Sequence, residues 1–184
     1  MLPLKGFKRS DLDFSLCGLN CALCPMKLGT YCPGCGGGEG NQSCKIAACS
    51  VEHKVEYCFL CAQYPCAKYE GIQQFDSFVT HQHQLKDVEY AKTMGLPAYH
   101  ELLSNKRAIL EELLYNWNEG RRKTLFGLAV NLLPLGDLQR ITNDLNMKSA
   151  QNPMTKKEAA DFLAASFLDA AVSQGIELKL RKKM

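Results

Sequence analysis

Ten cysteines crowd into one fifty-residue stretch of this 184-residue chain, and none follows it. They are Cys17, Cys21, Cys24, Cys32, Cys35, Cys44, Cys49, Cys58, Cys61 and Cys66. A packed core does not need a thiol at one position in five, so either disulfides or metal ions hold the stretch together. Thiolate sulfur is a preferred ligand of zinc and of iron–sulfur clusters.

The spacing of the cysteines favours metal over disulfides. Three Cys-x-x-Cys pairs are present: Cys21/Cys24, Cys32/Cys35 and Cys58/Cys61. A two-residue gap lets both sulfurs of one tight turn reach an ion about 2.3 Å away. The first sixteen residues hold no apolar run long enough for a signal peptide, so we expect a cytoplasmic protein whose thiols stay reduced.

We expect all ten cysteines to be structural metal ligands, with zinc favoured and about two ions bound. In chain order they form three groups: Cys17, Cys21 and Cys24; then Cys32, Cys35, Cys44 and Cys49; then Cys58, Cys61 and Cys66. Their partition among the ions stays open, and His53 is an alternative ligand. An iron–sulfur cluster is the alternative to zinc, because Cys17-x3-Cys21-x2-Cys24 is a tight run of the kind that such clusters use.

The charge of the chain bears on its partners. The formal net charge is +3, and two four-thiolate zinc sites, with two divalent ions and eight thiolates, would change it to −1. Such a protein is a poor partner for nucleic acid, although Arg121, Arg122 and Lys123 and the basic tail at 181–183 offer cations. No stretch approaches 18 apolar residues, so no membrane span is predicted.

Beyond residue 71 the cysteines give way to apolar residues at helical spacing. After a short apolar segment at 72–79, helices are predicted over 97–120, 125–133, 137–147 and 155–175. Thr155 and Glu158 form a capping box at the start of the last helix. The tail at 176–181 alternates apolar and polar residues, which predicts a short C-terminal strand.

The cysteine signature resembles that of an uncharacterised cysteine-rich family of anaerobic bacteria and archaea, catalogued as a domain of unknown function. The resemblance covers roughly residues 14–75. It rests on the motif from Cys17 to Pro25, the Cys-Pro-Gly-Cys turn at 32–35, the pair Cys44 and Cys49, and the run from Cys58 to Cys66. It implies metal binding, with zinc as the favoured ion, and implies no particular reaction.

Together these patterns predict a mostly α-helical protein. A small, irregular, cysteine-rich metal-binding module at 1–71 precedes a region of about four helices and a short strand at 72–184, which packs against the module. We expect a zinc-scaffolded binding module for a protein or small-molecule partner. An iron–sulfur redox or sensor protein is the alternative and a nucleic-acid-binding protein the third reading. No catalytic residue is assigned.

Overall fold

A computed structural model describes residues 7–38 and 44–183 of the chain. The chain divides into two compact units, which we call the N-terminal unit (residues 1–101 with 181–184) and the helical unit (residues 102–180). The division lies beyond residue 71, where the composition changes, so the N-terminal unit holds more than the cysteine-rich stretch.

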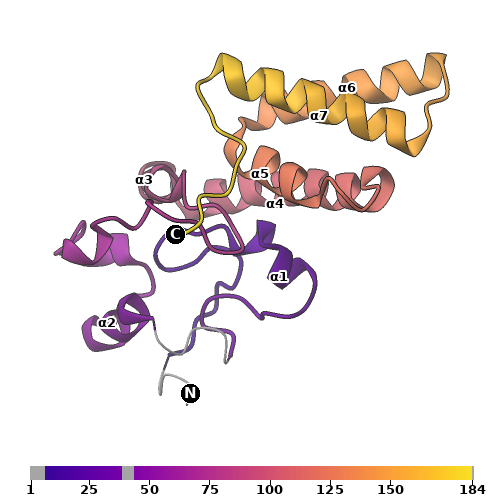
Figure 1. Ribbon diagram of the computed structural model, residues 1–184. Helices are drawn as coiled ribbons and strands as arrows, with labels where there is room; N and C mark the ends of the chain where they lie inside the picture. The colour runs from indigo at the N-terminus through magenta and orange to yellow at the C-terminus, as the bar shows by residue number, and fades with distance from the viewer. Residues whose placement is uncertain (1–6, 39–43, 184) are drawn as a thin grey trace. The chain divides into compact units, whose positions relative to one another are not determined.

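The chain is mostly helical, as predicted. Its α-helices are α1 (Pro25–Leu28), α2 (Lys45–His53), α3 (Gln84–Met94), α4 (Leu96–Glu112), α5 (Lys123–Leu132), α6 (Leu135–Gln151) and α7 (Lys156–Ser173) (Figure 1). The 3-10 turns among the described residues are η1 (Cys21–Leu23), η3 (Cys58–Leu60) and η4 (Ala67–Tyr69). A π-helical turn, η5 (Leu113–Trp117), continues α4. Within the described residues, no helix is long and apolar enough to span a membrane.

Five α-helices follow residue 72 where about four were expected. The additional helix is α3, whose buried residues are Gln84, Val88 and Ala91. It therefore lacks the stripe of large apolar side chains by which a helix is recognised from periodicity.

The helical unit packs around large apolar side chains. α6 and α7 pack along each other, and α5 packs against both (Figure 1). Phe126 and Phe167 are fully buried, with their rings edge to face and their centroids 6.2 Å apart. The capping box at Thr155 and Glu158 is confirmed, because each side chain accepts a hydrogen bond from the other residue's backbone amide.

The C-terminal tail is not the strand that its alternation predicts. The amide of Arg181 donates to Asp76 Oδ2 at 2.7 Å, and the amide of Asp76 donates to the Arg181 carbonyl at 2.8 Å. The Arg181 guanidinium also pairs with Asp76 at 2.9 Å. The β pairing among the described residues is a single bridge between Phe14 and Asn20, so the tail has no strand edge to extend.

The N-terminal unit has a smaller core that includes polar groups. Phe14 is fully buried and lies 4.5 Å, ring to ring, from Tyr99 of α4. The Tyr99 hydroxyl donates to Asn20 Oδ1 at 2.6 Å, and Asn20 Nδ2 donates to Asp87 of α3 at 2.9 Å. These contacts tie α3 and the start of α4 to the loop that carries the first cysteines.

Candidate metal centre

All ten cysteines lie in the N-terminal unit, and none of them forms a disulfide. Each residue is partly covered, neither fully buried nor fully exposed. The N-terminal unit therefore holds a dense set of reduced sulfur ligands within one compact body.

Two of the three Cys-x-x-Cys pairs adopt the same backbone turn. η1 begins at Cys21 and η3 at Cys58, and the second cysteine of each pair donates its amide to the carbonyl of the first at 3.0 Å. Cys24 and Cys61 then take nearly the same extended conformation, with φ/ψ of −79°/127° and −79°/134°. Each turn supplies two thiols from one short loop, as in four-thiolate sites.

The turn from Cys32 to Cys35 is packed tightly against the segment that precedes the first cysteine. Gly34 and Gly36 have left-handed backbone, with φ of +101° and +90°. A side chain at Gly34 would collide with the carbonyl of Leu12, and one at Gly36 would collide with Arg9. Only glycine allows this close approach without strain.

One group of thiols, which we call the first thiol set, consists of Cys17, Cys21, Cys35 and Cys44. Burial raises the pKa of Cys17 and that of Cys21 to about 12, and it raises the pKa of Cys35. The Cys44 thiol adds to this effect on both Cys17 and Cys35, so we include it in the set. The Cys58 thiol also acts on Cys17 and the Cys44 thiol on Cys58, so the first thiol set lies next to the cysteines around Cys58. Without a cation, these three thiols with raised pKa stay protonated at neutral pH.

The second thiol set consists of four cysteines that line one cavity of about 30 Å³: Cys49, Cys58, Cys61 and Cys66. A cavity of this volume has room for a bound ion or for ordered water. Burial raises the pKa of Cys58 to about 11, and the Cys66 and Cys49 thiols nearby contribute to the increase.

Two buried hydrogen-bond donors lie next to these thiols without a partner. Burial and the adjacent Cys58 thiol raise the pKa of Tyr69, yet the Tyr69 hydroxyl forms no hydrogen bond of normal geometry. Arg9 Nη2 is also unpaired, and the charge of its guanidinium opposes the effect of burial on the pKa of Cys35. Thiolates at Cys35 and Cys58 would supply acceptors for both donors. The residues present therefore fit thiolate-bound metal.

The rest of the Arg9 guanidinium holds the backbone around the first thiol set. Nη1 donates to the carbonyls of Asp11 and Phe14 at 2.9 Å, and Nε donates to the Glu56 carbonyl at 3.1 Å. The guanidinium carbon lies 4.8 Å from the centre of the Tyr57 ring. Arg9 thus joins two distant segments of the N-terminal unit, a role that its position in the sequence does not reveal.

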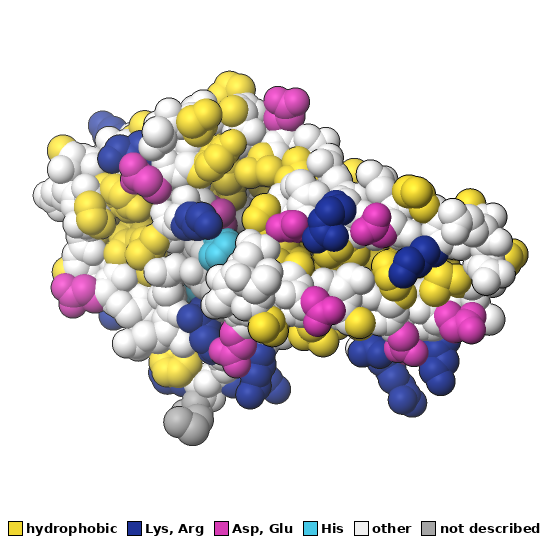
Figure 2. All heavy atoms as spheres, turned by 90° about the horizontal axis from the view of Figure 1, so that it is seen from above, with side chains coloured by type: hydrophobic (Ala, Val, Ile, Leu, Met, Phe, Trp, Pro, Cys, Tyr) yellow, Lys and Arg dark blue, Asp and Glu magenta, His cyan; other side chains and the backbone are white. Residues whose placement is uncertain are grey.

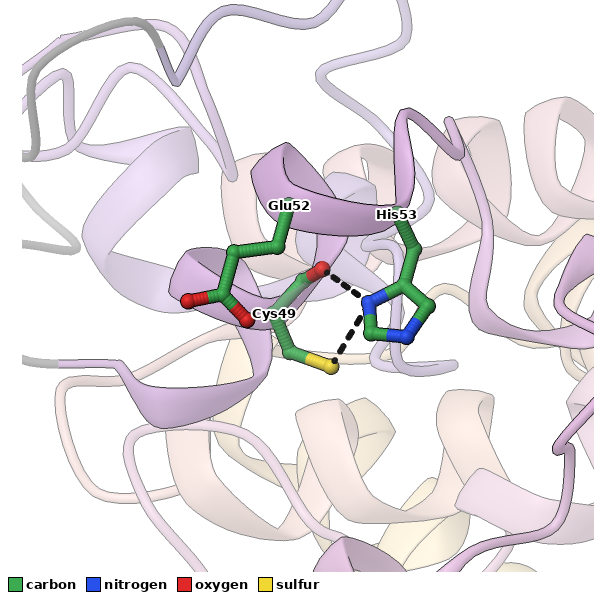
Figure 3. Close-up of side chains that lie close together, drawn as sticks. All are labelled: Cys49, Glu52 and His53. Carbon is green, nitrogen blue, oxygen red and sulfur yellow. Dashed lines mark hydrogen bonds between the residues drawn. The ribbon is translucent and has the colours of Figure 1, made fainter.

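A further group of ligand atoms lies on α2. Cys49, Glu52 and His53 follow the helical spacing i, i+3, i+4, and their ligand atoms all lie within 4.8 Å of one another (Figure 3). His53 Nδ1 lies 3.0 Å from the Cys49 carbonyl oxygen and 3.5 Å from the Cys49 sulfur. His53 was expected as an alternative ligand, whereas Glu52 was not. The helix α2, which places the two side chains together, was not predicted from the sequence.

Among the described residues, that group is the one set of three or more such side chains whose ligand atoms all lie so close together. In a closed four-thiolate zinc site the sulfurs stand about 3.8 Å apart, as tetrahedral bonds of about 2.3 Å require. The thiols of the two sets are therefore neighbours, at a wider spacing than in a closed zinc site.

The structure groups the cysteines differently from their order in the chain. Cys49 belongs by sequence to the middle group but lines the cavity of the last three cysteines. Cys44 is grouped with earlier cysteines because its thiol lies near that of Cys17, which precedes it by 27 positions. Cys24 lies beside Cys21, whose pKa its thiol helps to raise, and is a further candidate ligand of the first thiol set, whereas Cys32 is in neither set.

Two of the basic residues considered for nucleic-acid binding have acidic partners. Arg122 Nη2 lies 2.5 Å from Asp161 Oδ1, and Arg181 is paired with Asp76. Acidic and basic side chains are interspersed over the face that Figure 2 shows. These observations disfavour a continuous cationic surface for a phosphate backbone.

Comparison of the chain with protein-family models, with curated proteins and with solved structures finds no match. The two thiol sets, the buried donors beside them and the exposed group on α2 are therefore the observations from which a function can be inferred.

Proposed function

We propose that the protein binds about two zinc ions through thiolates of its N-terminal unit, and that the ions scaffold a binding module for a protein or small-molecule partner. The observation that carries this proposal is the cavity of the second thiol set, which four cysteines line together with His53. The first thiol set supplies four more ligands, and eight thiolates suffice for two closed zinc sites.

Structural ligation suits these thiols better than catalysis. Burial raises the pKa of Cys17, Cys21 and Cys58, whereas a nucleophilic cysteine needs a lowered pKa to be a thiolate at neutral pH. A zinc ion with four thiolates also has no open position for a substrate. We therefore assign these cysteines to binding metal and not to nucleophilic catalysis.

An iron–sulfur cluster is the second candidate, because the sulfurs are spaced more widely than around one zinc ion. In a cluster the cysteines bind different iron atoms, so their sulfurs do not have to meet as closely. The run from Cys17 to Cys24 has a spacing that such clusters use. A protein of this kind would transfer electrons or sense redox conditions.

Elemental analysis and visible absorption of the full chain, purified without oxygen, distinguish the two metals. We expect about two zinc atoms per chain and no colour. Iron, acid-labile sulfide and visible absorption would show that the thiolates bind an iron–sulfur cluster and not zinc. A chain that folds without any metal would contradict both readings.

Cys61→Ser tests the second thiol set directly. We expect this variant to lose about one zinc per chain and to lose structure in the N-terminal unit, since a hydroxyl is a poor zinc ligand. Gln63→Ser is the matched control, because Gln63 lines the same cavity without a thiol. Cys35→Ser should remove the other ion. A folded, metal-replete Cys61→Ser protein would exclude Cys61 as a ligand.

A further inference from the structure

We propose that His53 and Glu52 act as a transfer step for the metal ion of the second thiol set, which makes that ion exchangeable with an external acceptor. This inference rests on the proposed zinc binding. It assigns different behaviour to the two ions, one held for structure and one passed on. The acceptor is of a stated chemical class: a protein that presents thiolate or imidazole ligands.

The geometry on α2 brings two sets of ligands to one residue. Cys49 lines the cavity together with Cys58, Cys61 and Cys66, and it also belongs to the exposed group with Glu52 and His53. His53 lines that same cavity. We call the four cavity cysteines the inner ligands, and Glu52 and His53 the outer ligands. Cys49 cannot complete two separate four-coordinate sites unless its sulfur bridges two ions, so the inner and outer ligands are alternatives for one ion.

The His53 ring is oriented in the way that metal-binding histidines are. Its Nδ1 is 3.0 Å from the Cys49 carbonyl oxygen, and a ligating histidine commonly donates its second ring N–H to such an oxygen. With Nδ1 as the donor, the lone pair of the neutral ring lies on Nε2 (Figure 3). Because a carbonyl oxygen can only accept, this contact favours the tautomer that keeps the metal-binding lone pair on Nε2.

Exposure separates the outer ligands from the inner ones. Glu52 and His53 are both exposed, whereas Cys49, Cys58, Cys61 and Cys66 are all partly covered. The six ligating side chains exceed the four that a zinc ion needs. A surplus ligand beside a closed site permits exchange, because zinc can add a fifth ligand before it releases one.

The exchange involves no change of oxidation state. A bond forms between the ion and His53 Nε2, and one zinc–sulfur bond of the second thiol set breaks. The released thiolate takes a proton from water, and the ion stays divalent. Glu52 then offers an oxygen ligand at the surface, where the incoming acceptor replaces the remaining sulfurs one at a time.

The test measures the rate of zinc transfer from the zinc-loaded full chain to a small colour-forming chelator in excess. We expect two phases of equal size, one ion leaving quickly and one slowly. His53→Ala should slow the fast phase about tenfold, the scale on which metal-site partners act, with both ions still bound at the start. Glu52→Gln should slow it by a smaller factor.

Two further variants separate ligation from helix stability. Lys45→Ala, an exposed change at the start of α2, should transfer zinc at the wild-type rate. His53→Cys should restore the fast phase, because it returns a ligand without an imidazole. Zinc transfer from His53→Ala at the wild-type rate would overturn the proposal. A His53→Ala protein that binds only one zinc ion at the start would also overturn it, because His53 would then be a permanent ligand. A wild-type chain without zinc would instead refute the proposed function.

Discussion

The two units of this chain are stabilised in different ways. The helical unit contains long helices whose buried faces are made mainly of Leu, Ala and Phe side chains, with a capping box at the start of α7. The N-terminal unit contains three-residue 3-10 turns that begin at a cysteine or directly after one, and its core includes the buried polar residues Arg9, Asn20 and Gln84. Apolar burial supports the first unit, whereas the second depends on polar networks and, as we propose, on metal.

This contrast explains why so irregular a segment can hold one conformation. Structural zinc contributes on the order of 10–16 kcal/mol in small zinc modules. That contribution exceeds the free energy of unfolding of many whole domains. A unit with metal therefore needs few large apolar side chains, and the positions of its turns follow from ligand geometry.

Among substitutions outside the cysteines, the largest effect should appear in the helical unit. Phe167→Ala removes a fully buried ring that packs on Phe126, and we expect it to lower the free energy of unfolding of this unit by about 3–5 kcal/mol. Urea unfolding followed by circular dichroism measures this loss. Zinc content should not change, and Leu168→Ala, an exposed neighbour, should have little effect. Zinc loss in Phe167→Ala would show that the two units are not independent.

A smaller effect should appear in the N-terminal unit when Arg9 is replaced. Arg9→Met keeps an apolar chain but leaves the carbonyls of Asp11, Phe14 and Glu56 without their donor. We expect this unit to lose about 2–3 kcal/mol, since hydrogen bonds to charged groups are worth about 1.5–3 kcal/mol. Chelator-dependent unfolding of the N-terminal unit measures the change, with exposed Lys8→Met as the control. Equal stability of both variants would show that Arg9 does not organise this unit.

Acid should weaken the attachment of the C-terminal tail. Burial by itself would raise the pKa of Asp76, but hydrogen bonds from Arg181 and His81 outweigh it and lower the pKa below its ordinary value. The stabilisation is therefore complete above pH ~4, the ordinary pKa of the free carboxyl, and is lost as the pH falls through the lower folded-state pKa.

Arg181→Ala should remove most of this pH dependence and about 1–2 kcal/mol of stability at neutral pH. Hydrogen exchange of the Asp76 and Arg181 amides between pH 2 and pH 7 follows the attachment, with Lys182→Ala as the control. An attachment that persists unchanged in Arg181→Ala would mean that the backbone contacts alone hold the tail.

The smallest effect should come from the cap of α7. Thr155→Ala removes the side chain that accepts from the Glu158 amide, and we expect a loss of about 1 kcal/mol in the helical unit. Thermal unfolding detects a change of this size. Thr155→Ser keeps the hydroxyl and should retain most of the stability. If Thr155→Ser lost as much stability as Thr155→Ala, the effect would come from the methyl group of Thr155 and not from its hydroxyl.

Periodicity and capping signals predict the helical unit because its order is local. In α6, for example, Leu138, Ile141 and Leu145 recur at helical spacing, and all three are buried. The same reasoning misses α3, whose buried face is small and partly polar. It also mistakes the tail for a strand, because the contact that holds Arg181 joins residues 105 positions apart.

For the candidate site, the cysteines identify the ligand chemistry but not the grouping. Cys49 lies next to later cysteines because α2 places it on the wall of their cavity. Arg9 and Tyr69 have no motif, and their position beside Cys35 and Cys58 follows from tertiary packing alone. Glu52 could have been found once residues 45–53 were recognised as a helix, since its spacing from Cys49 is helical.

Amide hydrogen exchange of the full chain, with zinc bound and after removal by a chelator, tests the central claim most directly. It reports on both units in one sample. We predict that zinc removal abolishes protection in the N-terminal unit, above all around η1 and η3, and leaves α5, α6 and α7 as protected as before. Protection of the N-terminal unit that survives complete metal removal would contradict the claim that metal holds it together.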